Sequence, residues 1–252
     1  MIGISSPSFS FSNFSEKLDE IRKGFRLWEI VAELEHDLPA IEETVLYAVE
    51  SYDMKFQVHA PIADLNIGSP SERMRRHAID EVIMLADICG RLSVKVMTIH
   101  PGSAIAYGNE VKSRVRTATR ESILAIDKAL GGRDIKIALE NMPPGDWSIC
   151  YGIDELKSMI EGTGLGICFD VGHANVAGAV GGFLHDRDLL FNIHLHNNDG
   201  RSDQHLALDK GDIDLKPIVS AISRKYTGNY IIESRNLQEG VESKGVLESW
   251  LR

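Results

Sequence analysis

The feature that most constrains this chain of 252 residues is a regular alternation of short apolar segments with longer amphipathic ones. The apolar segments are hydrophobic throughout rather than at every second position, which is typical of parallel strands covered by helices. The expected strands are residues 2–6, 26–33, 55–61, 93–102, 134–142, 165–173, 189–193 and 230–234. The expected helices are residues 14–25, 38–51, 69–92, 110–130, 152–161, 214–226 and 241–251.

Eight expected strands, nearly all followed by an expected helix, predict one (β/α)₈ TIM barrel, an α/β fold that occupies residues 1–252 as a single domain. The main alternative is a doubly wound open sheet, which is expected to carry a glycine-rich phosphate-binding turn after its first strand. The sequence Ser5-Ser-Pro-Ser8 at that position is not such a turn. The barrel is therefore the favoured architecture.

Composition and charge limit where the chain works and what it binds. No apolar run approaches the ~20 residues that a membrane span needs, and the first residues lack the features of a signal peptide. The three cysteines have no paired spacing, so we expect buried free thiols and a reducing, cytoplasmic location. A formal charge of −10 argues against a broad nucleic-acid-binding surface, although a local basic patch stays possible.

Candidate metal ligands follow most of the expected strands. The carboxyl ends of barrel strands meet at one face, so donors at these positions come together there. The donors are His59, His100, Glu140, Asp170, His173, His196, Asp203, His205 and Glu233. Glu140 and Glu233 each end a short apolar strand, where an unpaired charge is costly. Mixed imidazole and carboxylate donors favour Zn²⁺, Mn²⁺, Fe²⁺ or Co²⁺.

Some of these residues also have a purely structural interpretation. Asp170 and His173 could cap the helix that follows them, and His59 could be a core histidine with satisfied hydrogen bonds. His194 lies two residues before His196 in the densest cluster of donors, and the sequence assigns it no role. Glu33 and Trp147 near the expected site are likewise left without a role.

Short motifs around these donors resemble the xylose isomerase-like barrels, and among them the endonuclease IV family of apurinic/apyrimidinic endonucleases. Glu140, Asp170, His196 and Glu233 are similar to a metal-binding quartet that the sugar isomerases and epimerases of the superfamily share. The remaining motifs resemble the endonuclease branch. They are His59-Ala-Pro, His100-Pro-Gly, Asp170-Val-Gly-His173, and Asp203-Gln-His205 followed by Gly211-Asp-Ile213.

The resemblance to endonuclease IV implies up to three zinc ions. The implied ligand sets are His59, His100 and Glu140 for one ion; Glu140, Asp170, His196 and Glu233 for a second; and His173, Asp203 and His205 for a third. A hydroxide that bridges the metals would then hydrolyse a phosphoester, either DNA at an abasic site or a smaller substrate. We favour this hydrolase hypothesis because five donors lie outside the quartet.

The alternative hypothesis is a sugar or sugar-phosphate isomerase or epimerase. It would use a single Mn²⁺, Co²⁺ or Mg²⁺, with Glu140 and Glu233 as the catalytic acid–base pair. The acidic surface, the second-strand carboxylates Glu29 and Glu33, and Trp147 near the expected site favour this alternative. The absence of a Gly/Ser-rich stretch in residues 141–147 argues against DNA binding. The sequence leaves the oligomeric state open.

Two basic clusters bear on DNA binding. They are Arg73, Arg75, Arg76 and His77, and Lys112, Arg114, Arg116 and Arg120. Each cluster follows a strand that carries proposed ligands, so both could flank the metal site. They could equally be solvated helix surface.

Overall fold

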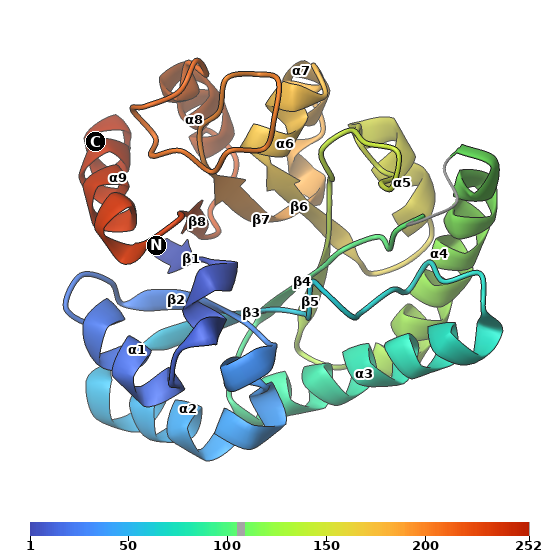
Figure 1. Cartoon of the computed structure of the whole chain (residues 1–252), viewed down its shortest axis with the longest axis horizontal. Coiled ribbons are helices and arrows are strands. Elements are labelled where there is room, and N and C mark those ends of the chain that lie inside the picture. The colour runs from blue at the N-terminus through green and yellow to red at the C-terminus, as the bar shows by residue number, and fades with distance from the viewer. Residues whose placement is uncertain (105–108, 252) are drawn as a thin grey trace.

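The computed structural model describes residues 1–104 and 109–251, and its eight parallel strands close into a barrel in sequence order. The strands are β1 (Ile2–Ser5), β2 (Leu27–Val31), β3 (Lys55–His59), β4 (Val96–Ile99), β5 (Lys136–Glu140), β6 (Gly166–Asp170), β7 (Leu190–Leu195) and β8 (Tyr230–Glu233). Pairing of β8 with β1 closes the ring. The predicted (β/α)₈ barrel is therefore confirmed, and Figure 1 shows its strands surrounded by helices.

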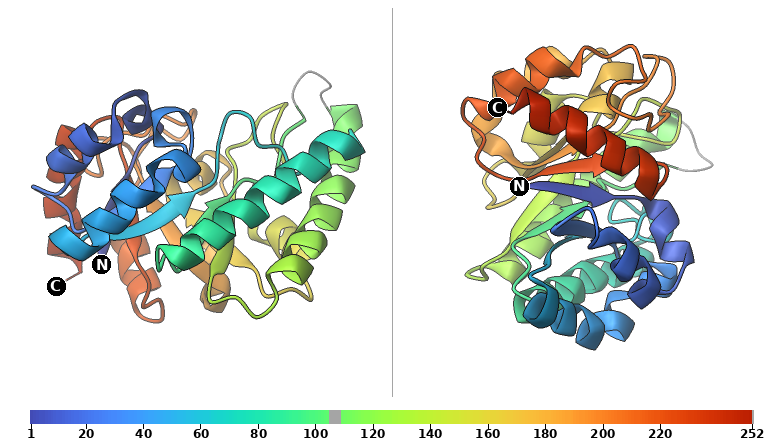
Figure 2. Two further views of the ribbon diagram at one scale, coloured as in Figure 1. Left: turned by 90° about the horizontal axis from the view of Figure 1, so that it is seen from below. Right: turned by 90° about the vertical axis from the view of Figure 1, so that its left-hand side faces the viewer.

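Nine α-helices and three 3₁₀ helices (η) connect the strands in the described part of the chain. The α-helices are α1 (Phe14–Ile21), α2 (Leu38–Tyr52), α3 (Glu72–Arg91), α4 (Asn109–Leu130), α5 (Ile153–Ile160), α6 (Val171–Val176), α7 (Val180–Phe183), α8 (Leu215–Ser223) and α9 (Leu237–Trp250). The 3₁₀ helices are η1 (Pro7–Phe11), η2 (Leu34–His36) and η3 (Arg187–Leu189). Figure 2 shows α3 and α4 side by side along one flank of the barrel.

Several predicted boundaries differ from the structure, and two of these differences have identifiable reasons. The sixth strand ends at Asp170 and not at residue 173, because Oδ1 of Asp170 accepts a hydrogen bond from the backbone N–H of His173 (2.6 Å) and starts helix α6. The last helix begins at Leu237 and not at residue 241, because the Asn236 side chain caps it by accepting from the N–H of Glu239 (3.0 Å). In both cases a polar capping residue marks a helix start that the hydrophobic pattern of the sequence alone does not reveal.

The interior of the barrel is partly polar. Gln57 on β3 donates a hydrogen bond to Asn192 on β7 (3.0 Å). These two strands are not neighbours in the barrel, so the contact crosses its interior. The apolar core lies mainly between strands and helices, where Trp28 of β2 stacks on Phe14 of α1 with ring centroids 4.8 Å apart. The polar interior lies below the ends of the strands that carry the candidate ligands.

Two sequence-based expectations concern the cysteines and the membrane. Cys89 and Cys168 are buried and free, as predicted, and so is Cys150. Among the helices of the described residues, none combines the length and the apolar character that a bilayer span requires.

Candidate metal centre

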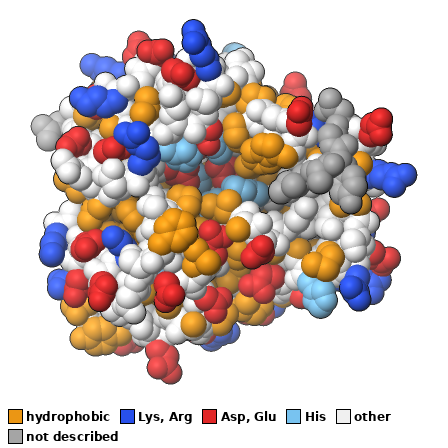
Figure 3. Space-filling view, viewed as in Figure 1, with side chains coloured by type: hydrophobic (Ala, Val, Ile, Leu, Met, Phe, Trp, Pro, Cys, Tyr) orange, Lys and Arg blue, Asp and Glu red, His pale blue; other side chains and the backbone are white. Residues whose placement is uncertain are grey.

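Every predicted donor lies at the carboxyl-terminal face of the barrel. His59, Glu140, Asp170 and Glu233 are the last residues of their strands, and His100 directly follows β4. His196 follows β7, His173 lies in α6, and Asp203 and His205 lie in the loop after β7. Figure 3, seen from the same side as Figure 1, shows histidine and carboxylate side chains in a hollow near the middle of this face. The donors fall into three groups, within each of which one ligand atom per residue lies within 4.8 Å of the others.

The first group consists of His59, His100 and Glu140. Nε2 of His59 and Nε2 of His100 lie 3.1 and 3.2 Å from the same oxygen, Oε2 of Glu140. Nδ1 of His59 lies 2.7 Å from the backbone carbonyl oxygen of Ala60. A carbonyl accepts and cannot donate, so Nδ1 carries the hydrogen and the lone pair of Nε2 faces the carboxylate.

The central group consists of Glu140, Asp170, His194 and Glu233, all of them buried. Nδ1 of His194 lies 3.2 Å from Oε1 of Glu140 and 3.1 Å from Oε1 of Glu233. Glu140 thus contributes one oxygen to the first group and the other to the central group. A carboxylate in this position can bridge two cations.

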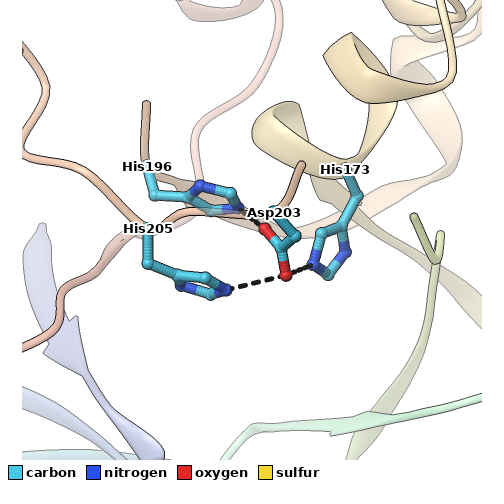
Figure 4. Close-up of side chains that lie close together, drawn as sticks. All are labelled: His173, His196, Asp203 and His205. Atoms are coloured by element: carbon cyan, nitrogen blue, oxygen red, sulfur yellow. Dashed lines mark hydrogen bonds and ion pairs between the residues drawn. The ribbon is translucent and has the colours of Figure 1, made fainter. Parts of the chain in front are cut away.

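The outer group consists of His173, His196, Asp203 and His205, which Figure 4 shows converging on the Asp203 carboxylate. Oδ2 of Asp203 lies 3.2 Å from Nε2 of His173 and 3.1 Å from Nε2 of His205, and Oδ1 lies 3.3 Å from Nε2 of His196. Nδ1 of His173 lies 2.8 Å from the carbonyl oxygen of Asn141, which holds its Nε2 toward the carboxylate.

Buried amides and one glycine hold the outer group in place. The buried side chain of Asn197 binds two later points of the loop that follows β7. Its Oδ1 accepts a hydrogen bond from the backbone N–H of Ile213 (3.0 Å), and its Nδ2 donates one to the backbone carbonyl of Leu208 (2.8 Å). Gly172 leaves room for the ring of His196, since a Cβ at position 172 would lie 1.9 Å from its Cε1. His205 has a φ of +48°, an unfavourable backbone conformation that is often found at functional sites.

The electrostatics of the site stabilise charged carboxylates. Burial alone would lower the pKa of His205, but its hydrogen bond with Asp203 and the charge of Glu233 raise that pKa to about 9. Burial would likewise raise the pKa of Glu233, but the neighbouring His194 holds it below its usual range. The pKa of Asp203 is lowered for the same reason, through His173 and His205 against the effect of burial. These negative charges also attract divalent cations.

The donor set fits metal ions. Oδ2 of Asp170 is buried and has no hydrogen-bond partner, a costly arrangement unless a cation binds it. The imidazole lone pairs of His59 and His173 face carboxylate oxygens, an arrangement that requires a proton or a metal ion between them. Cys168 also lies near Glu140 and His194, but burial raises its pKa well above the usual range, so the thiol is a weak ligand.

The geometry differs from the implied ligand sets at one position. His196 was expected beside Glu140 and Glu233, and it lies instead in the outer group with Asp203. His194 occupies the expected place, because it pairs in register with Asp170 on the adjacent strand and its ring faces the barrel interior. His196 still touches the central group, since its Nε2 lies 3.1 Å from Oδ1 of Asp170.

The structure shows the surroundings of Glu33 and Trp147, the two other residues to which the sequence assigned no role. Glu33 lies outside the three donor groups, where its Oε2 accepts hydrogen bonds from the backbone N–H groups of Ile62 (2.9 Å) and Ala63 (3.1 Å). Trp147 is 42% exposed and lines a groove of about 320 Å³ beside His100. None of the described residues that line this groove is Lys, Arg, Asp or Glu.

Three arginines of the two basic clusters are paired with carboxylates, and a fourth contacts backbone carbonyls. Arg75 pairs with Glu121 at 2.8 Å, and Arg76 pairs with Glu72. Arg116 pairs with Glu155 at 2.5 Å. The guanidinium of Arg120 donates to backbone carbonyls at the end of α5. These four arginines already have partners within the chain.

A closed (β/α)₈ barrel with imidazole and carboxylate donors grouped at the carboxyl ends of its strands defines the class of protein: a TIM barrel with candidate metal-binding sites. The chain belongs to the xylose isomerase-like TIM barrel family, whose model matches residues 20–251. Both the barrel and the family were predicted from the sequence.

Relatives within this class carry different names. An uncharacterized protein of Methanocaldococcus jannaschii is 29% identical, over 99% of this chain and 88% of its own. A probable endonuclease 4 of Thermosipho melanesiensis is 27% identical, over 64% of this chain and 62% of its own. The crystal structure of a D-tagatose 3-epimerase-like protein superimposes with a TM-score of 0.90 at 27% identity and covers 99% of this chain and 96% of that one.

Proposed function

We propose that this protein is a metal-dependent phosphoester hydrolase that uses more than one divalent cation, with zinc as the main one, and acts on a small phosphoester. One observation carries the proposal: two further donor groups flank the central group, and Glu140 belongs to both the first and the central group. A reaction that needs a single metal ion has no use for the imidazoles of the first and outer groups. The relatives named as probable endonuclease 4 support the same reaction class.

The donor residues would have distinct roles in holding the cations. Glu140 would hold two cations at a fixed spacing, and Asp203 with its imidazole partners would hold a third. Bound cations of this kind polarise phosphoryl oxygens and activate water. Backbone carbonyls orient the rings of His59 and His173, so the ligand atoms require little reorganisation.

The size and charge of the surroundings favour a small substrate over DNA. DNA binding depends on Lys and Arg that neutralise several phosphates. In this chain Arg75, Arg76 and Arg116 are paired with carboxylates, and the formal net charge is −10. The uncharged groove beside His100 would suit one small organic group attached to a phosphate.

A second candidate is a sugar or sugar-phosphate epimerase. Oε1 of Glu140 and Oε1 of Glu233 lie 3.2 and 3.1 Å from Nδ1 of His194, and two carboxylates this close together could exchange a proton with a substrate carbon. The similarity to the D-tagatose 3-epimerase-like protein favours this candidate. The two candidates make opposite predictions for the outer group.

The test compares both activities in one matched pair of variants. The metal-loaded protein should hydrolyse bis(p-nitrophenyl) phosphate, and Asp203→Asn should lower the rate at least about 100-fold, because the shared carboxylate of the outer group is lost. Asp209→Asn is the control, since this carboxylate contacts Lys210 outside the three donor groups. Deuterium uptake from solvent into ketoses, unaffected by Asp203→Asn and without phosphoester hydrolysis, would favour the epimerase instead.

A further inference from the structure

A buried polar layer lies in the barrel interior beneath the central group. Its side chains come from β2, β3, β4 and β7, and none is more than 2% exposed. The layer consists of Glu29, Gln57, Thr98, Asn192 and His194. A carboxylate at such depth costs several kcal/mol, about the effective penalty per buried ion, unless specific partners stabilise it. The contacts of Glu29 therefore indicate its role.

Glu29 has three close partners. Its Oε2 accepts hydrogen bonds from Nδ2 of Asn192 (2.7 Å) and Nε2 of Gln57 (3.1 Å). Its Oε1 lies 2.7 Å from Nε2 of His194, a close ion-pair contact that does not have hydrogen-bond geometry, and Oε1 has no hydrogen-bond partner among the described residues. No described Lys or Arg forms an ion pair with Glu29. The amides therefore hold one oxygen of this carboxylate and leave the other facing the imidazole.

These contacts determine which nitrogen of His194 can bind a metal. A carboxylate at 2.7 Å keeps the ring proton on Nε2, which leaves the lone pair on Nδ1. Nδ2 of Asn192 lies 3.1 Å from the same Nε2, but its two hydrogens have shorter contacts with Glu29 (2.7 Å) and Thr98 (2.9 Å). Nδ1 then faces Glu140 and Glu233.

We propose that Glu29 is a positioning residue of the metal centre, which fixes the tautomer and orientation of His194 so that Nδ1 binds the central cation. This arrangement is the reverse of His59 and His173, whose Nδ1 atoms face backbone carbonyls and whose Nε2 atoms face the carboxylates. The inference rests on the metal ions of the proposed function and not on the substrate. Metal affinity tests it even if no phosphoester is hydrolysed.

Replacing Glu29 with Gln separates this role from simple packing, because the amide has nearly the same shape. If the amide nitrogen takes the place of Oε1, it donates to Nε2 of His194 and forces the hydrogen onto Nδ1. If it takes the place of Oε2, it opposes the amide donors of Asn192 and Gln57. The first orientation removes the metal-binding lone pair, and the second frees a neutral oxygen that holds the ring less firmly.

The experiment measures zinc affinity by competition with a chromophoric chelator. Glu29→Gln should weaken the binding of the central ion about 10- to 100-fold, the usual effect of losing such a partner. Ser122→Ala, which removes a buried side-chain hydrogen bond in α4 away from the three donor groups, should change the affinity less than about threefold. In a His194→Asn background, Glu29→Gln should have no further effect.

Three results would overturn the inference. They are an unchanged affinity in folded Glu29→Gln, an equal loss in Ser122→Ala, and a full additional loss in the His194→Asn background. If Glu29→Gln does not fold, ¹⁵N NMR of the zinc-loaded wild-type protein decides. The inference requires a hydrogen on Nε2 of His194 and metal at Nδ1, and the opposite assignment contradicts it.

Discussion

The ring of His196 lies directly against Gly172, so that a Cβ at position 172 would come within 1.9 Å of the ring carbon Cε1. Gly172 belongs to α6, the helix that Asp170 caps and that carries His173. The outer group therefore depends on the absence of a side chain at this position.

Gly172→Ala should displace the His196 ring and weaken binding of one metal ion at least about tenfold, with a loss of stability of about 1–3 kcal/mol from overpacking. Metal titration and urea unfolding measure the two effects. Gly181→Ala in α7 is the control, because a Cβ there meets no heavy atom within 4 Å. Unchanged metal binding in Gly172→Ala would show that His196 is not a ligand.

Sequence patterns predicted which residues surround the site, and the resemblance implied their division into groups except at one position, where His194 takes the place expected for His196. Glu140 and Glu233 were identifiable because each is a charge at the end of an apolar strand. His194 and His196 could not be told apart, since residues two positions apart in a strand face the same side. The pairing of His194 with Asp170 depends on strand register, which the sequence does not reveal.

Long-range contacts explain the other differences. Glu29 was expected to favour a sugar-binding site, yet it is buried beneath His194, 165 positions away in sequence. The strand boundary at residue 173 was wrong because Val171 continues the apolar pattern while Asp170 already caps a helix. The basic clusters were visible in the sequence, but Arg75 and its partner Glu121 come from different helices.

Abasic duplex DNA should bind weakly, and its affinity should be insensitive to the pair of changes Arg75→Glu and Arg76→Glu. Both arginines already have carboxylate partners in the chain, so reversing them removes no phosphate contact. Fluorescence anisotropy across a salt series measures this. Tight binding by the wild-type protein, with a log–log salt slope that decreases by about 1 per reversed arginine, would establish a DNA-binding surface.

His36 should make the protein less stable as the pH falls from about 6.5 to about 4. Burial lowers the pKa of His36 from 6.5 to about 4, and its Nε2 has no hydrogen-bond partner beside the rings of Phe14 and Trp28. Within this window the unfolded chain binds about one proton that the folded ring does not, so acid favours unfolding; above pH 6.5 the contribution is fully present.

Urea unfolding of the chelator-treated protein at several pH values tests this. His36→Leu should reduce the dependence of stability on pH within that window, while His77→Gln, a change of an exposed histidine in α3, should leave it unaltered. An identical pH dependence in His36→Leu would mean that His36 titrates normally in the folded protein.

The number of metal ions per chain tests the central claim most directly. Protein purified without chelator should contain two to three ions per chain, mainly zinc, by elemental analysis and native mass spectrometry. His205→Ala should remove about one ion and leave the central group occupied, because His205 belongs to the outer group. A single ion per wild-type chain, unaffected by His205→Ala, would contradict the multinuclear centre and leave the epimerase as the better account.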